Sequence, residues 1–279
     1  MINMVQIELY KIFKKWRTYI GFIAIGVLVP IIQVAMLYEG EHSINFVTRN
    51  IRESFVFVGN LLNSYFISYI ILNALAVHIP FLITLVAADL LAGEATAGTY
   101  RLLVPRPVSR MKIVTSKFLA GTIYTNFLIL WLAVISLGLG FVIFGVGELI
   151  VLKSGTIIIF EKSDVLWRFF LAYGYASLGM TVVCSLAFLF SSLVENAIGP
   201  IISTMAVIIV FIIVSAINIE LFQGIKPYLF TSHILKWREF FNDPVDTFKI
   251  IESTLILFGH AVLFFGLAAF VFRKKDILS

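Results

Sequence analysis

Residues 196–219 read NAIGPIISTMAVIIVFIIVSAINI, a long stretch without a charged side chain. A helix of about 20 apolar residues can cross the hydrocarbon core of a bilayer. Backbone N–H and C=O groups find no water in that core, so a crossing segment must satisfy its own hydrogen bonds. The stretch therefore predicts a transmembrane helix, which we place at 197–219.

Five further uncharged stretches occur in the chain, and the composition agrees with them. Of the 279 residues, 60% are hydrophobic and 13% are charged, whereas a soluble domain has roughly 45–50% apolar and about 25% charged residues. So few charges could not cover a water-facing surface. The predicted fold class is an all-α membrane protein, one transmembrane domain over 1–279. Its six transmembrane helices are predicted at 18–38, 64–92, 112–146, 166–192, 197–219 and 250–273.

The segment 2–17, which precedes the first apolar stretch, has the pattern of an amphipathic helix. At about 100° per residue, six apolar residues fall in a stripe roughly 100° wide, and three lysines fall opposite. Such a helix lies flat on a membrane, with its aromatic rings toward the acyl chains. The alternative is a surface helix of a soluble domain. The stripe contains Ile2, Val5, Leu9, Ile12, Phe13 and Trp16, and the lysines are Lys11, Lys14 and Lys15.

The placement of lysine and arginine predicts the orientation. If the N-terminus is cytoplasmic, the inner segments carry twelve basic and five acidic residues, and the outer segments carry nine basic and eleven acidic residues. We therefore expect a multi-pass protein of the cell's inner (cytoplasmic) membrane with both termini cytoplasmic. The extracytoplasmic segment 220–249 is expected to form short interfacial helices. The basic residues flank apolar stretches, so no nucleic-acid partner is expected.

The sequence contains no recognisable catalytic motif. The phosphate-binding loop GxxxxGK[ST] is absent, as are the HExxH and GxSxG motifs. The four histidines are scattered singly, and Cys184 lies in an apolar run. We expect no enzymatic activity, metal site or cofactor in this chain.

Four polar side chains within the predicted spans are candidates for a substrate path, because polar groups in hydrocarbon are costly and often mark function. The alternative is that each one hydrogen-bonds to a neighbouring helix. Pro80 and Pro200 also fall in apolar stretches, where proline is expected to kink a helix. The four candidates are His78, Asn73, His260 and Asn126.

The stretch at residues 93–121, GEATAGTYRLLVPRPVSRMKIVTSKFLAG, differs from the other connections. Gly98 permits a tight backbone path, and Thr99 can cap a helix. Two prolines, Pro105 and Pro107, would stop a short helix. We predict a short rigid helix over 93–110 that projects below the membrane between the second and third spans.

This stretch resembles the ABC-2 type transporter permease family, the membrane-spanning subunits of ATP-binding cassette transporters. The family shows a glutamate, a Gly-Thr pair, two leucines, a proline with a following arginine, and a lysine that opens the next span. The residue match is confined to this stretch, while the six-span topology extends over the whole chain. The matching residues are Glu94, Gly98, Thr99, Leu102, Leu103, Pro107, Arg110 and Lys117.

By that resemblance, 93–110 would be the coupling helix that docks on an ATPase subunit, with Arg101 among its contact residues. The loop 191–197, which contains Glu195, would be the second contact, and 2–17 would be the elbow helix. Two permease subunits, identical or different, would work with ABC ATPase subunits that bind ATP and magnesium. The resemblance implies a permease that forms the translocation path, with export as its expected direction.

Three alternatives stay open. A secondary transporter or channel would need no ATPase, but such proteins usually bury ionisable groups within their spans. Asp89 and Glu195 lie near span ends instead. An intramembrane enzyme would need a nucleophile or metal motif. A structural factor of a membrane complex would show no substrate-stimulated ATPase activity with its partners.

Overall fold

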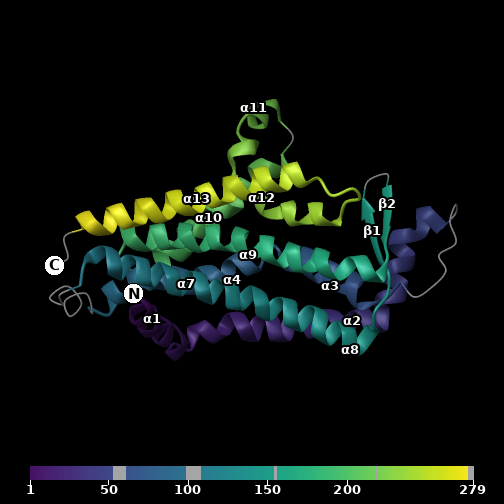
Figure 1. Cartoon of the computed structure of the whole chain (residues 1–279), viewed down its shortest axis with the longest axis horizontal. Coiled ribbons are helices and arrows are strands. Elements are labelled where there is room, and N and C mark those ends of the chain that lie inside the picture. The colour runs from purple at the N-terminus through teal and green to yellow at the C-terminus, as the bar shows by residue number, and fades with distance from the viewer. Residues whose placement is uncertain (53–60, 99–107, 154–155, 218, 276–279) are drawn as a thin grey trace.

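The computed structural model describes residues 1–52, 61–98, 108–153, 156–217 and 219–275, the side chains of 41 and 43–52 excepted. The helices run roughly along one long axis, and both termini lie at the same end (Figure 1). Within the described ranges, six helical stretches are long and apolar enough to span a membrane, which confirms a mostly helical, multi-pass architecture. They are Arg17–Gly40, Ile79–Thr96, Arg110–Phe144, Lys162–Leu193, Ile198–Ala216 and Thr247–Lys274.

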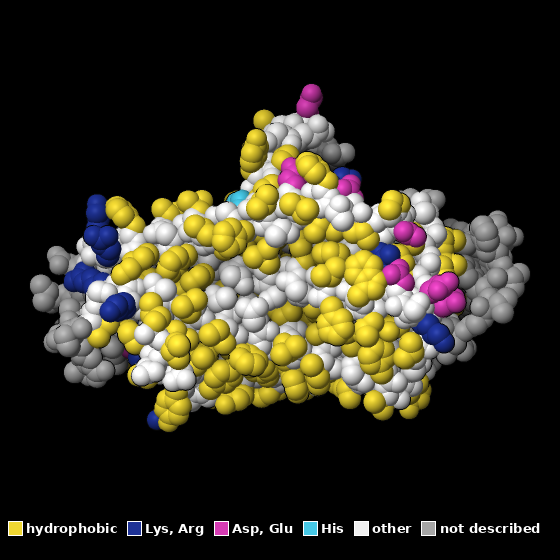
Figure 2. Space-filling view, viewed as in Figure 1, with side chains coloured by type: hydrophobic (Ala, Val, Ile, Leu, Met, Phe, Trp, Pro, Cys, Tyr) yellow, Lys and Arg dark blue, Asp and Glu magenta, His cyan; other side chains and the backbone are white. Residues whose placement is uncertain are grey.

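The two ends of the bundle differ in charge. The terminal end contains α1 (Ile2–Lys14), the end of α5 (Asp89–Thr96) and the end of α13 (Thr247–Lys274), and the hairpin end contains two short strands. In Figure 2, apolar side chains cover the middle of the molecule, lysine and arginine gather at the terminal end, and acidic side chains lie on the segment that projects from the bundle and toward the hairpin end. An apolar belt between charged ends is a surface suited to lipid.

Part of the apolar stripe predicted for α1 packs on the bundle. Apolar residues of α7 (Arg110–Ala133) and its neighbours lie against it. The helical pattern identified the stripe but could not identify what the stripe contacts. The residues in this contact are Val5, Leu9, Ile12 and Phe13. The apolar side chains that remain exposed here are Ile2, Ile7, Tyr10 and Trp16.

Two further details differ from the prediction. The apolar span Arg17–Gly40 agrees with the predicted 18–38, but the helix itself, α2 (Arg17–Arg52), continues past it, because charged residues end an apolar span without ending a helix. Pro200 does not kink its span. It is the third residue of α10 (Ile198–Ala216), where its missing N–H would have had no helical partner.

The second predicted span, 64–92, is three helices instead of one. The first break lies at 76–78. Pro80 has no N–H, and its ring would clash with the carbonyl four residues earlier, so a regular helix cannot run through it. The His78 side chain compensates in part, since its Nδ1 lies 2.9 Å from the carbonyl oxygen of Ala74. The three helices are α3 (Ser64–Leu75), α4 (Ile79–Ala87) and α5.

The second break, between α4 and α5, is made by a residue of another helix. The Ser191 hydroxyl donates to the carbonyl oxygen of Ala88 at 2.6 Å. It accepts from the backbone N–H groups of Leu91 and Ala92 at 3.1 and 2.9 Å. A side chain inserted into the helical hydrogen-bond ladder bends the helix. Ser191 thereby fixes α5 to the end of α9 (Lys162–Leu193).

The third span is continuous but irregular. α7 passes into a π-helical turn, η1 (Val134–Leu139), and α8 (Gly140–Phe144) completes the span. Gly145, with φ +70°, follows the last helical residue. Glycine adopts this left-handed region at little cost, so it ends the helix without strain.

The predicted all-α fold class is wrong at residues 149–160. Two strands, β1 (Leu149–Lys153) and β2 (Thr156–Phe160), pair antiparallel with Leu149 opposite Phe160. Their sequences, LIVLK and TIIIF, are rich in β-branched residues, which favour strands. Leu149 and Val151 are fully buried, so the hairpin packs against the bundle.

α9 forms the centre of the bundle, with buried residues along its whole length. It packs along α13 and α7. Small residues let helices approach closely, and Ala172, Ala176 and Gly179 serve this purpose. A Cβ added at Gly179 would lie only 3.2 Å from the side chain of Ile234. Cys184 is buried, as expected for a small packing residue.

The segment 220–249 turns back into the bundle. Trp237 and Phe241 are buried, with ring centroids 5.8 and 5.1 Å from that of Tyr69 in α3. Phe241 also lies 5.0 Å from Phe169 of α9. The segment forms short helices as predicted, and these two rings pack between α3 and α9. The helices of the segment are α11 (Glu220–Gln223), η2 (Lys226–Tyr228), α12 (Phe230–Ile234) and η3 (Leu235–Phe241).

Candidate functional site

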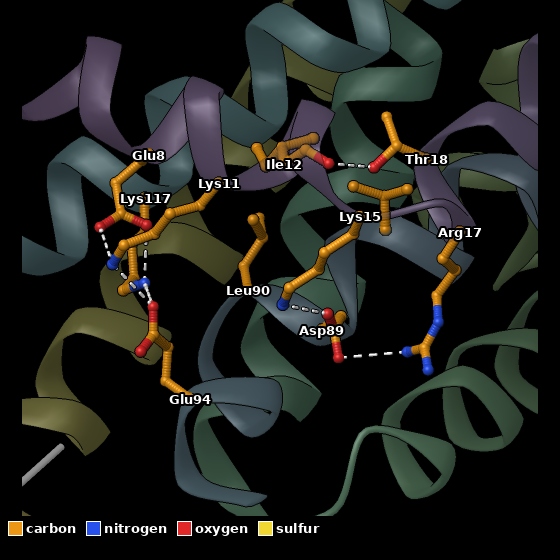
Figure 3. Close-up of a pocket in the computed structure, with 11 residues that line it drawn as sticks. Glu8, Lys11, Ile12, Lys15, Arg17, Thr18, Asp89, Leu90, Glu94 and Lys117 are labelled. Carbon is orange, nitrogen blue, oxygen red and sulfur yellow. Dashed lines mark hydrogen bonds and ion pairs between the residues drawn. The ribbon is translucent and has the colours of Figure 1, made fainter. Parts of the chain in front are cut away.

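Four charged side chains meet at the terminal end, as Figure 3 shows. The side chain of Lys117 is 1% exposed, and its Nζ lies 2.7 Å from Glu8 Oε2 and 2.8 Å from Glu94 Oε1. Lys11 Nζ lies 3.0 Å from Glu8 Oε1 and 2.9 Å from Glu94 Oε1. We call these four residues the ion-pair cluster. It joins α1, α5 and α7, which are separate in sequence.

The ion-pair cluster is electrically balanced. Two lysines and two glutamates give no net charge, and each ion contacts two ions of opposite sign. Buried charges are tolerated when they are paired in this way. Burial alone lowers the pKa of Lys11, but its hydrogen bonds to Glu94 and Glu8 outweigh that effect and raise the pKa above the ordinary lysine value. Lys11 therefore stays charged at neutral pH.

A second group of charges lies beside the first. Asp89 of α5 accepts from Lys15 Nζ at 2.7 Å and from Arg17 Nη1 at 3.1 Å. Ile12 and Leu90 lie between the two groups (Figure 3). The cavity here measures about 20 Å³, room for about one water molecule and not for a cargo. Among the described residues, no group of three or more His, Cys, Asp or Glu could hold a metal ion.

The predicted coupling residues are described only in part. Glu94 belongs to the ion-pair cluster. The predicted helix 93–110 is not continuous, because Gly98, with φ +66°, follows the end of α5, and Arg110 already belongs to α7. Arg110 Nη1 donates to the backbone carbonyl oxygens of Arg273 and Lys275, at 3.0 and 2.9 Å. Outside the described residues lie Thr99, Arg101, Leu102, Leu103 and Pro107.

The structure brings the described start of the first predicted contact segment, 93–98, to the second, 191–197. Thr96 Oγ1 lies 2.6 Å from the backbone carbonyl oxygen of Glu195, to which it donates. Ser191 is bonded to the backbone of α5 in the same region. We call residues 93–98 and 191–197 the contact patch. Its two segments are far apart in sequence but continuous at the terminal end.

The four candidates for a substrate path make local hydrogen bonds. Asn73, His78 and His260 each bond to the carbonyl oxygen four residues earlier, at 2.8–2.9 Å. Asn126 does the same toward Thr122 at 2.7 Å and also contacts Ser177 of α9. Within the described residues, no hydrogen bond joins any two of the four. In the described part of the chain, only Asn126 makes the bond to a neighbouring helix that the alternative expected, and the other three bond within their own chain segment.

Sequence reasoning missed three features of this site. Lys117 was singled out only as the lysine that opens the third span, but it is buried and doubly paired. Glu8 lies four residues before Ile12, so it shares the face of the helix that carries the apolar stripe. A carboxylate on a buried face is almost always paired, so its position indicates a cationic partner. Ser191 gave no such signal, since its partners lie about a hundred positions away.

Comparison with known proteins places the chain in a family. A family model described as "Protein of unknown function (DUF2705)" matches residues 22–278. The uncharacterized protein YhcI of Bacillus subtilis (strain 168) is 26% identical over 208 residues, which cover 70% of this chain and 63% of that protein. The matched part of this chain thus spans less than two thirds of that relative's length. Because the family model matches nearly every residue, this chain belongs to the DUF2705 family.

Proposed function

We propose that this chain is the permease subunit of an ATP-binding cassette transporter of the ABC-2 type. In this proposal it forms the translocation path and pairs with a second permease subunit, identical or different. Separate ABC ATPase subunits bind ATP and magnesium and supply the energy for export. The terminal end faces the cytoplasm, where the ATPases dock, and the chain resides in the cytoplasmic membrane.

The observation that carries this proposal is the way the contact patch is fastened to the membrane helices. Glu94, at the end of the second span, is ion-paired to Lys117 of α7 and to Lys11 of α1. Ser191 links the same span to α9. A force applied to the patch therefore reaches several helices through short, buried contacts, as a lever requires. In this role α1 acts as the elbow helix.

The charge at the two ends supports the proposed orientation. Basic residues close to span ends favour the cytoplasmic side. At the terminal end, Arg110 contacts the backbone of the C-terminal residues Arg273 and Lys275. Lys15 and Arg17 lie at the start of the first span.

The first test is co-purification. The tagged chain is extracted from its native membranes in mild detergent, and we expect an ABC ATPase to be recovered in equal amount. Glu195→Lys reverses a charge on the exposed part of the contact patch and should remove the ATPase. Lys162→Glu, at the exposed start of α9 near the hairpin end, is the matched control and should retain it.

The second test is function after reconstitution. Glu94→Gln and Thr99→Val should leave membrane insertion intact while ATP hydrolysis no longer drives transport. Recovery of the wild-type chain without any ATPase, together with solute flux in proteoliposomes that lack ATP, would reject the proposal. That result would favour the secondary transporter or channel.

A further inference from the structure

A second, larger cavity lies between the ends of two spans. Its volume is about 610 Å³, and its walls come from α10, η2, α12, η3 and α13. Ser215 lies next to the last residue of α10, and Lys249 is the third residue of α13. Both helices are long and apolar enough to cross a membrane, so their ends mark the level of the membrane surface away from the termini.

Three lysines and one glutamate line this cavity. Lys226, Lys236 and Lys249 come from three different elements, and Glu252 is the one carboxylate among the lining residues that the structure describes. Lys236 Nζ lies 3.5 Å from Glu239, and Lys249 Nζ lies 2.9 Å from Asp246. An ammonium group has three N–H donors, so each of these lysines keeps donors for a further acceptor.

Hydroxyl groups also line the cavity. Ser215 Oγ lies 2.9 Å from Ser232 Oγ, which links α10 to α12. His233 Nε2 lies 2.8 Å from the Pro227 carbonyl oxygen, which can only accept, so in the neutral ring Nε2 carries the proton. His233 Nδ1 then accepts from Ser253 Oγ at 2.9 Å. These bonds connect α10 to α12, and α12 to η2 and α13, around the cavity.

The rest of the lining and the surroundings are apolar. Ile212, Ala216 and Leu235 complete the wall. Next to lining residues in the sequence, Tyr228 is 73% exposed and Phe248 is 77% exposed. Large apolar side chains exposed at the level of a membrane surface are suited to the acyl boundary rather than to water. The ligand that fits both the charges and this position is an amphipathic anion.

We propose that this cavity binds the phosphate-bearing headgroup of an anionic membrane lipid, with the lysines at the phosphate and an acyl chain along Ile212. Charge-assisted hydrogen bonds from ammonium groups to phosphate are short and strong. The site does not depend on the proposed transport function, since lipid binding requires neither an ATPase nor a cargo. It lies at the opposite membrane surface from the contact patch.

Lipid binding is measured by native mass spectrometry of the purified chain with phosphatidylglycerol and, separately, phosphatidylcholine. We expect preferential binding of phosphatidylglycerol. Replacing Lys226, Lys236 and Lys249 by glutamine should weaken that binding by about fivefold for each lysine. Lys162→Gln removes an exposed lysine near the hairpin end but outside the cavity, and it should bind as the wild type does.

A second variant tests the cavity independently, so that the proposal remains testable even where the triple variant does not fold. Ala216→Trp fills the apolar side of the cavity without removing a charge, and it should also abolish the preference for phosphatidylglycerol. Undiminished binding in both the triple variant and Ala216→Trp would overturn the proposal. Displacement of the lipid by millimolar inorganic phosphate would overturn it as well, because the site would then belong to a soluble anion.

Discussion

Replacing Lys117 by methionine should release α1 from the bundle. The lysine side chain is 1% exposed, and its Nζ contacts two carboxylates, Glu8 at 2.7 Å and Glu94 at 2.8 Å. Those carboxylates are themselves only 10% and 12% exposed. Without Lys117, the four-residue cluster keeps one lysine for two carboxylates, and its charges no longer balance.

The expected cost follows from burial. Breaking a buried ion pair by removing one partner costs about 3–5 kcal/mol. Because about 1.4 kcal/mol is a factor of ten in an equilibrium constant, the opening equilibrium should shift by roughly 100- to 5,000-fold. The local opening with the lowest free energy is the detachment of α1 from the bundle, because Glu8 then reaches water while the spans remain in place.

Hydrogen–deuterium exchange of the purified chain measures this shift. In Lys117→Met, the amides of α1 should lose protection by a factor within that range, while those of α9 keep theirs. Lys112→Met removes an exposed lysine from the same helix and should have no effect. Adding Glu8→Leu to Lys117→Met should restore part of the protection, because the pair is then replaced by apolar groups.

The reasoning fails if α1 in Lys117→Met is protected within about threefold of the wild type, since a difference that small is well under 1 kcal/mol. It also fails if α1 and α9 lose protection equally, because the ion-pair cluster would then hold the whole bundle and not α1 in particular.

Further substitutions test other contacts, each by thermal unfolding in detergent. Ser191→Ala should cost about 1–3 kcal/mol by leaving buried backbone groups of the second span unpaired, while Ser192→Ala, whose hydroxyl bonds within its own helix, should cost less. Gly121→Val should cost about 1–3 kcal/mol through overpacking, because a Cβ there would lie 2.5 Å from a leucine methyl; Gly174→Val, with no atom within 4 Å, is the control. Arg168→Met should cost about 2–4 kcal/mol, since its guanidinium donates to two backbone carbonyls of the 220–249 segment at 2.8 and 2.9 Å. Alkaline pH should weaken the attachment of α1, because a raised pKa adds stability that is present at neutral pH and lost as pH rises through the pKa of Lys11 in the folded chain; exchange in α1 that does not change between neutral and strongly alkaline pH would contradict this.

The candidate site was predictable only in part. Glu94, Gly98 and Arg110 were singled out from one stretch of sequence, and all three lie at the terminal end. The ion pairs of Glu94 with Lys11 of α1 and Lys117 of α7 were not predicted. Which side chains share a buried cluster depends on how helices pack, and a single sequence does not encode that locally.

The sequence by itself determined the membrane character, the six helical stretches and the approximate place of each one. Charges and unpaired backbone groups are costly in hydrocarbon. This cost depends only on the residues within one contiguous stretch, so each stretch can be judged from its own sequence. Even the break before Pro80 follows from that residue's own chemistry.

Tertiary structure alone decided what the helices contact. The break at Ala88 is made by Ser191, aromatic rings of the 220–249 segment pack between α3 and α9, and four residues of the α1 stripe pack on the bundle. Each depends on residues many positions apart. Lipid and protein interiors are similarly apolar, so hydrophobic pattern cannot tell which of the two a side chain will meet.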